Sequence, residues 1–411
     1  MTDKRPTLQD IKSAAAIMQN HLVHTPMVRT AVMSDETGAE VFLKLENLQV
    51  TGSFKARGAM IKIASLTEAE RSAGVIAMSA GNHAQGVAYH AGRLGIPATI
   101  VMPKNTPFSK VARTESHGAT VELIGADVAE AADAAASIAQ QTGATFIHPF
   151  DDPAVIAGQG CVGLEMLRDD PALDAIIVPI GGGGLISGVA IAAKALRPDI
   201  EIIGVQSEAF PFMQQAMGNK VSPAVPTEVG VAEGIAVKRP GALTREIVRD
   251  LVSDIVLVSE MQIERAIQRL AEQEKIVAEG AGAVGVAALM SDPSRWTGRR
   301  VGVVICGGNI DSRLLSTILL RGLSRDGRMA RLRITLPDKP GALAAISALI
   351  GDAGANIVEI VHQRLFYDLP VRYAEVDVAL ETRNRGHVDK LIGLLTEKGF
   401  PARFAGNDSS H

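Results

Sequence analysis

The residue with the clearest chemical potential in this chain is Lys55. An apolar, strand-like run at 41–46 leads into a short polar loop, and a helical pattern begins after Ser53, a favourable capping residue. Lys55 is therefore predicted in the first turn of a helix, where the helix dipole disfavours a second positive charge. A lysine of lowered pKa attacks carbonyl groups and forms Schiff bases. Taken alone, however, a lysine after a serine cap is usually a solvated surface residue.

A run of four glycines, Gly181–Gly184, argues against interpreting Lys55 as an ordinary surface residue. It follows an apolar strand pattern at 175–178 and precedes an alanine-rich helical pattern at 186–196. Backbone N–H groups converge at such a strand–loop–helix junction, and the absent side chains let a phosphate approach closely. No lysine of the Walker type follows the glycines, which disfavours a nucleoside triphosphate.

A second strand-to-helix junction, at 78–86, carries the side chains of Ser79, Asn82 and His83. A helix N-terminus surrounded by these groups suits a carboxylate. An ordinary capped helix start explains the same residues equally well.

The run 158–163 fits the pattern GxGxxG, but it lies inside a helical pattern and no strand precedes it. The dinucleotide-binding fingerprint requires that strand. The sequence therefore predicts that these glycines serve close helix packing, and a dinucleotide-dependent oxidoreductase is disfavoured.

The elements that must position these residues follow an alternating pattern from 41 to 322, which predicts an α/β fold with mostly parallel, buried strands. Helical patterns of about a dozen residues separate the strands. The candidate strands are 41–46, 75–79, 98–102, 120–124, 145–147, 175–179, 201–206, 255–258 and 300–305.

Together these motifs closely resemble the threonine dehydratases (threonine ammonia-lyases), pyridoxal-phosphate (PLP) enzymes of fold type II, the tryptophan-synthase-β fold. The combination is specific, although each motif alone is not. The resembling residues are 52–59, 79–86, 148–152, 158–160, 181–184 and 306–309.

The resemblance implies a two-lobed catalytic domain over residues 1–325, with a smaller lobe at about 48–154 and PLP between the lobes. Lys55 would hold PLP covalently and, once released, act as the general base at the substrate Cα. Ser79, Asn82 and His83 would bind the substrate carboxylate. The remaining cofactor contacts would come from Phe54, Asn82, Gly181, Gly182, Gly183, Gly184, Leu185 and Cys306.

Cys306, at the end of an apolar strand, would face the pyridine nitrogen. A neutral thiol cannot protonate that nitrogen as an aspartate would, so the ring becomes a weaker electron sink. We expect this to favour prompt β-elimination. Without the Gly-Gly-Asn that follows it, Cys306 would be read as a small buried hydrophobe.

Two departures from the related serine racemases are informative. Ala80 stands where racemases carry a serine that acts as the second acid–base group, so racemisation is disfavoured. The racemase metal site would use Glu208 and the Phe212 carbonyl, but Gln214 replaces its second acid. Hard cations prefer several carboxylate oxygens, so no metal site is predicted.

After a polar break at 324–328, the order β-α-β-β-α-β predicts an α+β, ferredoxin-like plait over 328–405. The segments 336–343 and 354–357 make it resemble an ACT domain, a module that commonly binds amino acids where two copies pair. Isoleucine is the expected effector and valine the opposing one. A plain oligomerisation domain is the alternative, and the tail 406–411 is expected to be disordered.

Composition limits the remaining classes. The chain has 411 residues, enough for two or three domains, and its 47% hydrophobic and 3% aromatic content predicts an aliphatic core. A net charge of −4 without a long basic run makes nucleic acid or membrane an unexpected partner. Two cysteines, and an N-terminus without an apolar signal core, indicate the cytoplasm.

The sequence therefore predicts a threonine ammonia-lyase that acts as a homo-oligomer, a dimer or tetramer. Serine or 3-hydroxyaspartate remains open as the substrate, and the role remains open between biosynthesis and catabolism. A non-catalytic amino-acid sensor is the alternative of a different class, although it would have no need for Lys55.

Overall fold

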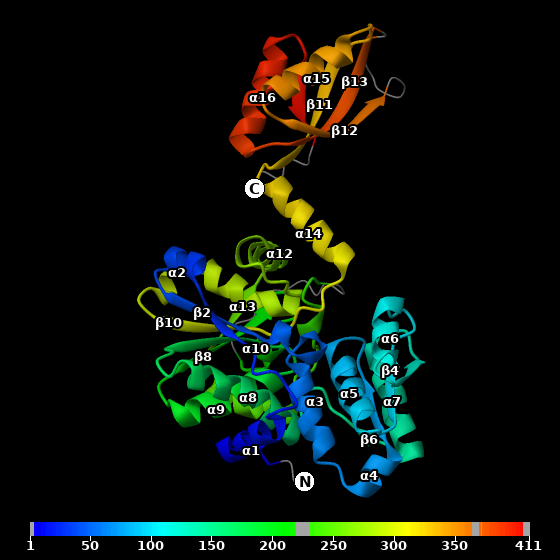
Figure 1. Cartoon of the computed structure of the whole chain (residues 1–411), viewed down its shortest axis with the longest axis vertical. Coiled ribbons are helices and arrows are strands. Elements are labelled where there is room, and N and C mark those ends of the chain that lie inside the picture. The colour runs from blue at the N-terminus through cyan, green and yellow to red at the C-terminus, as the bar shows by residue number, and fades with distance from the viewer. Residues whose placement is uncertain (1–3, 219–229, 364–369, 371, 406–411) are drawn as a thin grey trace. The chain divides into compact units, whose positions relative to one another are not determined.

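A computed structural model of the chain (Figure 1) describes residues 4–218, 230–363, 370 and 372–405. The chain divides into two compact units, Met1–Ile310 and Asp311–His411. Helix α14 (Ser312–Arg325) groups with the second unit, although it lies within the range 1–325 expected for the catalytic domain. The predicted disordered tail at 406–411 lies outside the described residues.

The first unit is built around a six-stranded sheet whose strands are parallel except for β1, which pairs antiparallel with β2 at one edge. Its central strands are continuous apolar runs with both faces covered, as is typical of parallel sheets. In spatial order the strands are β1 (Met27–Thr30), β2 (Glu40–Leu45), β10 (Arg300–Ile305), β7 (Ala175–Pro179), β8 (Glu201–Ser207) and β9 (Asp254–Val258).

Helices cover both faces of this sheet (Figure 1). Helix α13 (Gly280–Ser291) packs across one face, and α9 (Gly184–Leu196) packs on the other, where α8 (Pro153–Asp169) lies against it. The other helices of this part are α1 (Leu8–Met18), α2 (Ala31–Thr37), α10 (Phe212–Ala216), α11 (Ala242–Leu251) and α12 (Glu260–Arg269).

A second, four-stranded parallel sheet lies within the residues predicted for the smaller lobe. Its core is aliphatic, formed by side chains such as Ile100, Val87 and Ile147. The strands in spatial order are β5 (Thr120–Leu123), β4 (Ala98–Met102), β3 (Val75–Met78) and β6 (Thr145–Phe146). The helices of this lobe are α3 (Lys55–Ala64), α4 (Glu68–Ala73), α5 (Asn82–Arg93), α6 (Phe108–Glu115) and α7 (Val128–Thr142).

The glycines of the GxGxxG run lie inside α8, as predicted. A Cβ atom on Gly158 would lie 2.7 Å from the Arg57 carbonyl oxygen, and one on Gly160 would lie 2.9 Å from that of Gly188. Both glycines thus allow close approach of α8 to α3 and α9. The prediction of close helix packing is confirmed.

The second unit contains the predicted plait. Its antiparallel sheet has the order β12 (Asn356–Gln363), β13 (Tyr373–Glu381), β11 (Met329–Pro337) and β14 (Ala402–Phe404). Helices α15 (Ala342–Asp352) and α16 (Arg385–Glu397) supply apolar side chains, including Ile346 and Leu391, to a core shared with the strands. The predicted α+β fold is confirmed.

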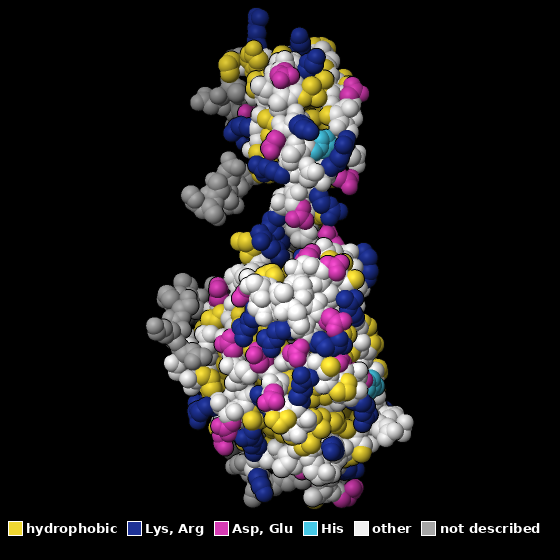
Figure 2. All heavy atoms as spheres, turned by 90° about the vertical axis from the view of Figure 1, so that its left-hand side faces the viewer, with side chains coloured by type: hydrophobic (Ala, Val, Ile, Leu, Met, Phe, Trp, Pro, Cys, Tyr) yellow, Lys and Arg dark blue, Asp and Glu magenta, His cyan; other side chains and the backbone are white. Residues whose placement is uncertain are grey.

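The surface of the first unit is electrostatically mixed on the face shown in Figure 2, where basic and acidic side chains are interspersed. Within the described part of the chain, no helix combines the length and apolar character needed to cross a membrane.

Candidate active site

Lys55 is the first residue of α3, but the helix does not start as predicted. Phe54, not Ser53, holds the N-cap position, and no side chain caps the helix. Ser53 instead forms an isolated bridge with Gly307, and the Phe54 N–H donates to the Cys306 carbonyl at 3.1 Å. The predicted serine cap is therefore wrong. The backbone before Lys55 is fixed by the residues that follow β10.

The Lys55 amine donates a hydrogen bond to the Pro149 carbonyl at 2.8 Å, and the Phe54 ring centroid lies 5.2 Å away from it. Burial lowers the pKa of Lys55 to about 8, while Cys306 and Glu279 act in the opposite direction. The lowered pKa was predicted, but its main cause is desolvation, not the helix dipole. At pH 7 about one amine in ten is then neutral, which an ordinary surface lysine would not approach.

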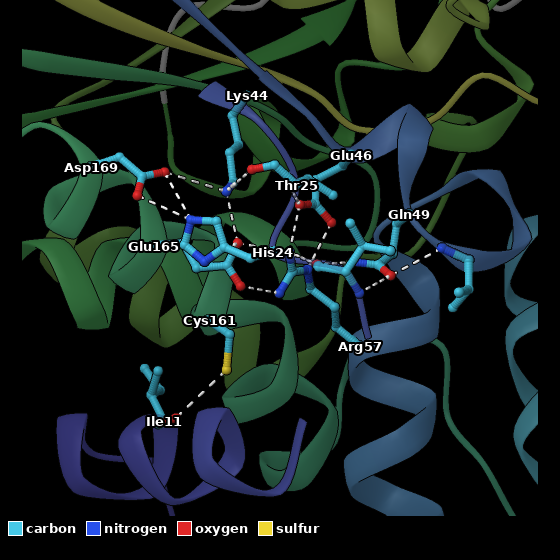
Figure 3. Close-up of polar contacts among 12 residues, drawn as sticks. Ile11, His24, Thr25, Lys44, Glu46, Gln49, Arg57, Cys161, Glu165 and Asp169 are labelled. Atoms are coloured by element: carbon cyan, nitrogen blue, oxygen red, sulfur yellow. Dashed lines mark hydrogen bonds and ion pairs between the residues drawn. The ribbon is translucent and has the colours of Figure 1, made fainter. Parts of the chain in front are cut away.

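A buried ionic network holds α3 in place (Figure 3). The Arg57 guanidinium makes paired contacts of 2.6–2.9 Å with the carboxylates of Glu46 and Glu165, and it is 1% exposed. Although burial acts against both charges, the partners raise the pKa of Arg57 and lower that of Glu165. Lys44 adds a 2.7 Å contact to Glu165. Removing one member of a buried pair typically costs about 3–5 kcal/mol, so the network fixes the helix that begins with Lys55.

The glycine loop Gly181–Gly184 joins β7 to α9, as predicted. Helix α9 begins at Gly184, so the first amides of the helix, including that of Leu185, have no partners within it. Gly183 has φ = +98°, and a Cβ on Gly182 would lie 2.3 Å from the Phe150 ring. The loop therefore requires glycine, and it leaves an open array of backbone donors suited to a phosphate.

Polar atoms left without partners support a ligand here. In the described part of the chain, the Ser53 and Ser187 hydroxyls and both amide atoms of Gln159 are buried without a hydrogen-bond partner. Ser187 lies in the first turn of α9, and a Cβ on Gly184 would lie 2.5 Å from the Gln159 amide oxygen. Buried polar groups are rarely unsatisfied in native proteins. The residues around the loop thus fit a phosphate-bearing cofactor.

Asn82 lies between two partners that fix its amide. Its Nδ2 donates to Glu279 Oε1 at 2.6 Å, and its Oδ1 accepts from Asn309 Nδ2 at 2.7 Å. Arg113, on α6 of the smaller lobe, donates to Asn309 Oδ1 at 3.1 Å. One of the two Nδ2 hydrogens of Asn82 remains available for the cofactor contact that the resemblance implies.

Glu279 is a functional candidate that the sequence reasoning missed. Burial raises its pKa to about 7, so it can hold or release a proton near neutral pH. It sits at the N-cap position of α13, yet its side chain does not cap that helix. In the sequence, Glu279 is only an acidic residue before a glycine-rich helix start. Its contact with Asn82, which is far away in the sequence, is what places it in the candidate site.

The predicted carboxylate site is assembled only in part. The amides of α5 begin at Asn82, and the Ser79 hydroxyl accepts from the Gly81 N–H at 3.1 Å. His83, however, contacts the Ile147 carbonyl through Nε2 at 2.8 Å, and burial lowers its pKa to about 3. A neutral, engaged imidazole offers no positive charge. The helix N-terminus, Ser79 and Asn82 are the stronger candidates for binding a carboxylate.

Cys306 lies directly after β10 and is 2% exposed. Burial, with Glu279 acting in the same direction, raises the pKa of its thiol well above the ordinary value. The group therefore stays a neutral thiol at physiological pH, which is what its predicted role beside a pyridine nitrogen requires.

Cys306 variants test that role. Cys306→Ser should keep β-elimination within about tenfold of the wild-type rate, because a hydroxyl is also a weak partner for the ring nitrogen. Cys306→Asp should lower elimination further, since a buried carboxylate stabilises a protonated ring. Initial rates of oxo-acid formation measure both, and an aspartate variant as fast as wild type would show that the thiol lies elsewhere.

Gln214, which replaces an acidic residue of the racemase metal site, donates its amide to the Ile255 carbonyl at 2.8 Å. Within the described residues, no group of three His, Cys, Asp or Glu side chains could hold a metal ion.

Known families and relatives match most of the chain. Residues 18–307 match the family described as pyridoxal-phosphate dependent enzyme, and residues 330–390 match the ACT domain. The chain is 46% identical to an L-threonine ammonia-lyase of Thermotoga maritima over 400 residues, 97% of this chain and 100% of the relative. It is also 46% identical to the L-threonine dehydratase catabolic TdcB of Escherichia coli K12 over 313 residues, 76% of this chain and 95% of the relative.

Among solved structures, a maize serine racemase is similar, with a TM-score of 0.72 and 35% identity over 78% of this chain and 99% of that one. The matched catalytic region contains Lys55, the glycine loop and Cys306, and the cofactor of this family is PLP. The chain belongs to the family of pyridoxal-phosphate dependent enzymes and carries a C-terminal ACT domain.

Proposed function

We propose that this chain is a threonine ammonia-lyase, which converts L-threonine to 2-oxobutanoate and ammonia by β-elimination. Over 97% of its length the chain is similar to a relative named L-threonine ammonia-lyase, which supports threonine as the substrate. The single structural observation that carries the chemistry is the Lys55 amine, whose pKa is lowered to about 8. A sensor without catalysis would have no use for such an amine.

The residues divide the work between them. PLP, when bound, supplies the electron sink for the pair of electrons left at the substrate Cα. Lys55 takes the Cα proton, which a neutral amine of pKa about 8 can do. The N-terminus of α5, with Ser79 and Asn82, orients the carboxylate. The neutral Cys306 thiol keeps the ring a weaker electron sink, so the β-hydroxyl leaves promptly.

A panel of β-hydroxy amino acids tests the substrate. Initial rates with L-threonine, L-serine and 3-hydroxyaspartate, with ammonia and oxo acid both quantified, should give the highest kcat/KM for threonine. Among the described candidate site residues, none is proposed to bind the second carboxylate of 3-hydroxyaspartate. A higher kcat/KM for serine or 3-hydroxyaspartate would reassign the substrate within the same chemistry.

Ala80 is expected to make the enzyme a poor racemase, despite its likeness to a serine racemase. Its methyl group packs against the aliphatic core of the smaller lobe and cannot deliver a proton to the second face of the substrate. Incubation with L-serine in D₂O, followed by chiral analysis, should yield far more pyruvate than D-serine. Comparable amounts of the two products would contradict this expectation.

Regulation by an amino acid is the second part of the proposal, and the ACT domain supports it. The loop 338–341 precedes α15 and borders a hollow of about 510 Å³. The hollow is lined by Pro337, Lys339, Pro340, Gly341, Ala342, Ala345, Lys398, Gly399 and Phe400. A helix N-terminus and two lysines suit the carboxylate of an effector.

The loop 354–356, within the second segment that resembles an ACT domain, does not line this hollow. It follows α15, whereas the first loop precedes it. With 11 residues, α15 separates the two loops by about 16 Å. The two loops of one chain therefore lie too far apart to hold the same small amino acid together.

Isoleucine remains our proposed inhibitor and valine its opponent, because isoleucine is the end product of the pathway that starts from threonine. We also propose that the enzyme is a cytoplasmic homo-oligomer, a dimer or tetramer, as ACT domains commonly pair. A role in isoleucine biosynthesis follows if isoleucine inhibits.

A further inference from the structure

Gln159 is a buried side chain that the proposed chemistry leaves unused. It lies on α8, is 1% exposed, and neither its amide nitrogen nor its amide oxygen has a hydrogen-bond partner among the described residues. A buried amide without hydrogen-bond partners destabilises a folded protein. Such a group calls for an explanation.

The position of this amide supplies one. Its Nε2 lies 3.1 Å from where a Cβ on Gly58 would stand, and its Oε1 lies 2.5 Å from where a Cβ on Gly184 would stand. Gly58 is three residues beyond Lys55 on α3, and Gly184 is the first residue of α9. The amide therefore occupies the space between the helix that carries the catalytic lysine and the phosphate loop.

Neither amide atom has a partner that fixes its orientation, so a turn of the amide by about 180° places Nε2 beside Gly184, where Oε1 now lies. We propose that Gln159 is a further cofactor-positioning residue, whose amide N–H, turned in this way, hydrogen-bonds the phosphate held by the glycine loop. The two glycines that flank it have no side chains to shield it from the loop. An amide donor binds a phosphate without adding charge, and it is satisfied only when the phosphate is present. The inference rests on the proposed placement of phosphate on Gly181–Gly184, and not on the identity of the substrate.

The test compares PLP with pyridoxal, which lacks the phosphate, as ligands of the full-length enzyme stripped of cofactor. Gln159→Leu should raise the Kd for PLP at least tenfold and change the Kd for pyridoxal less than twofold. The ³¹P resonance of bound PLP should shift in the same variant. The stripped variant should unfold at the same temperature as the stripped wild type or higher, because leucine loses no hydrogen bond there.

Gln49 provides a matched control. It is also a buried glutamine, 3% exposed, but its amide bonds the Val23 N–H at 3.1 Å and the Val23 carbonyl at 2.7 Å. Gln49→Leu should therefore lower the unfolding temperature of the stripped enzyme and leave the ratio of the two Kd values unchanged. This is the opposite pattern to that expected for Gln159→Leu.

The outcomes separate the two claims. If Gln159→Leu raises the Kd values for PLP and pyridoxal equally, or changes neither, the role of Gln159 is refuted. Its amide would then be satisfied by internal water both with and without the cofactor. If the wild type itself does not prefer PLP over pyridoxal, the phosphate site fails instead. Turnover of threonine enters neither comparison, so an error in the proposed substrate would not affect the result.

Discussion

Replacement of Lys55 by alanine is expected to lower the rate of 2-oxobutanoate formation by at least ~10³-fold. The change removes both the amine proposed to hold the cofactor and the base proposed to take the Cα proton. The buried Arg57 network, which fixes α3, is untouched by it. The variant should therefore fold and still bind PLP through the glycine loop, although without a covalent bond.

Borohydride reduction of the wild-type enzyme provides the direct measurement, because it should fix PLP on the peptide that contains Lys55. Lys62 is the matched control, since it lies on the same helix and pairs with Asp152 at 2.6 Å. Lys62→Ala should retain most of the rate and the label. Labelling at any lysine other than Lys55 would overturn the assignment.

Removal of the ACT domain is expected to abolish regulation and leave catalysis intact. The coupling between separate sites is usually 1–3 kcal/mol, so isoleucine should shift the apparent threonine affinity of the full-length enzyme roughly 5–150-fold. Truncation after Leu323 should bring this shift to zero, because it removes the ACT domain. PLP binding and elimination should stay intact, because no catalytic candidate lies beyond Asn309. The E. coli relative supports this expectation, because 76% of this chain is enough to match 95% of that relative's length.

A pair of point variants refines this test without truncation. Ala345 lines the hollow beside α15, whereas Ala348, also exposed on α15, does not. Ala345→Trp should weaken the isoleucine response at least tenfold by filling the hollow, and Ala348→Trp should not. Inhibition that survives truncation would place isoleucine in the active site. A full-length enzyme indifferent to all branched-chain amino acids would make the domain structural.

The sequence predicted most of the fold because the strands of a buried parallel sheet are continuous apolar runs. Strands such as β7 and β10 coincide with their predicted ranges. The strand that was missed, β1, is a short, largely exposed edge strand whose sequence MVRT lacks both an apolar run and a clear alternation. Its pairing with β2 is a tertiary contact that local pattern cannot reveal.

The parts of the site that consist of a local motif could be predicted from the sequence. The parts that depend on contacts between residues far apart in the sequence could not. The glycine loop was found because four glycines are costly anywhere else. Ser53 was misassigned as a helix cap because its bridge with Gly307 joins residues far apart in the sequence. Glu279 and Gln159 were missed for the same reason. Each is an ordinary residue type in an ordinary setting until the fold brings it beside Asn82 or Gly184.

The separation of the two loops at opposite ends of α15 would link the proposed effector binding to mass action. An amino acid that touches both loops must be held by two copies of the chain, because one helix keeps the loops about 16 Å apart. Such an effector stabilises the associated state, and association in turn raises the effector's affinity. Sensitivity to the amino acid then depends on enzyme concentration, so dilution below the dissociation constant of the pair would silence the response while each free copy kept its active site.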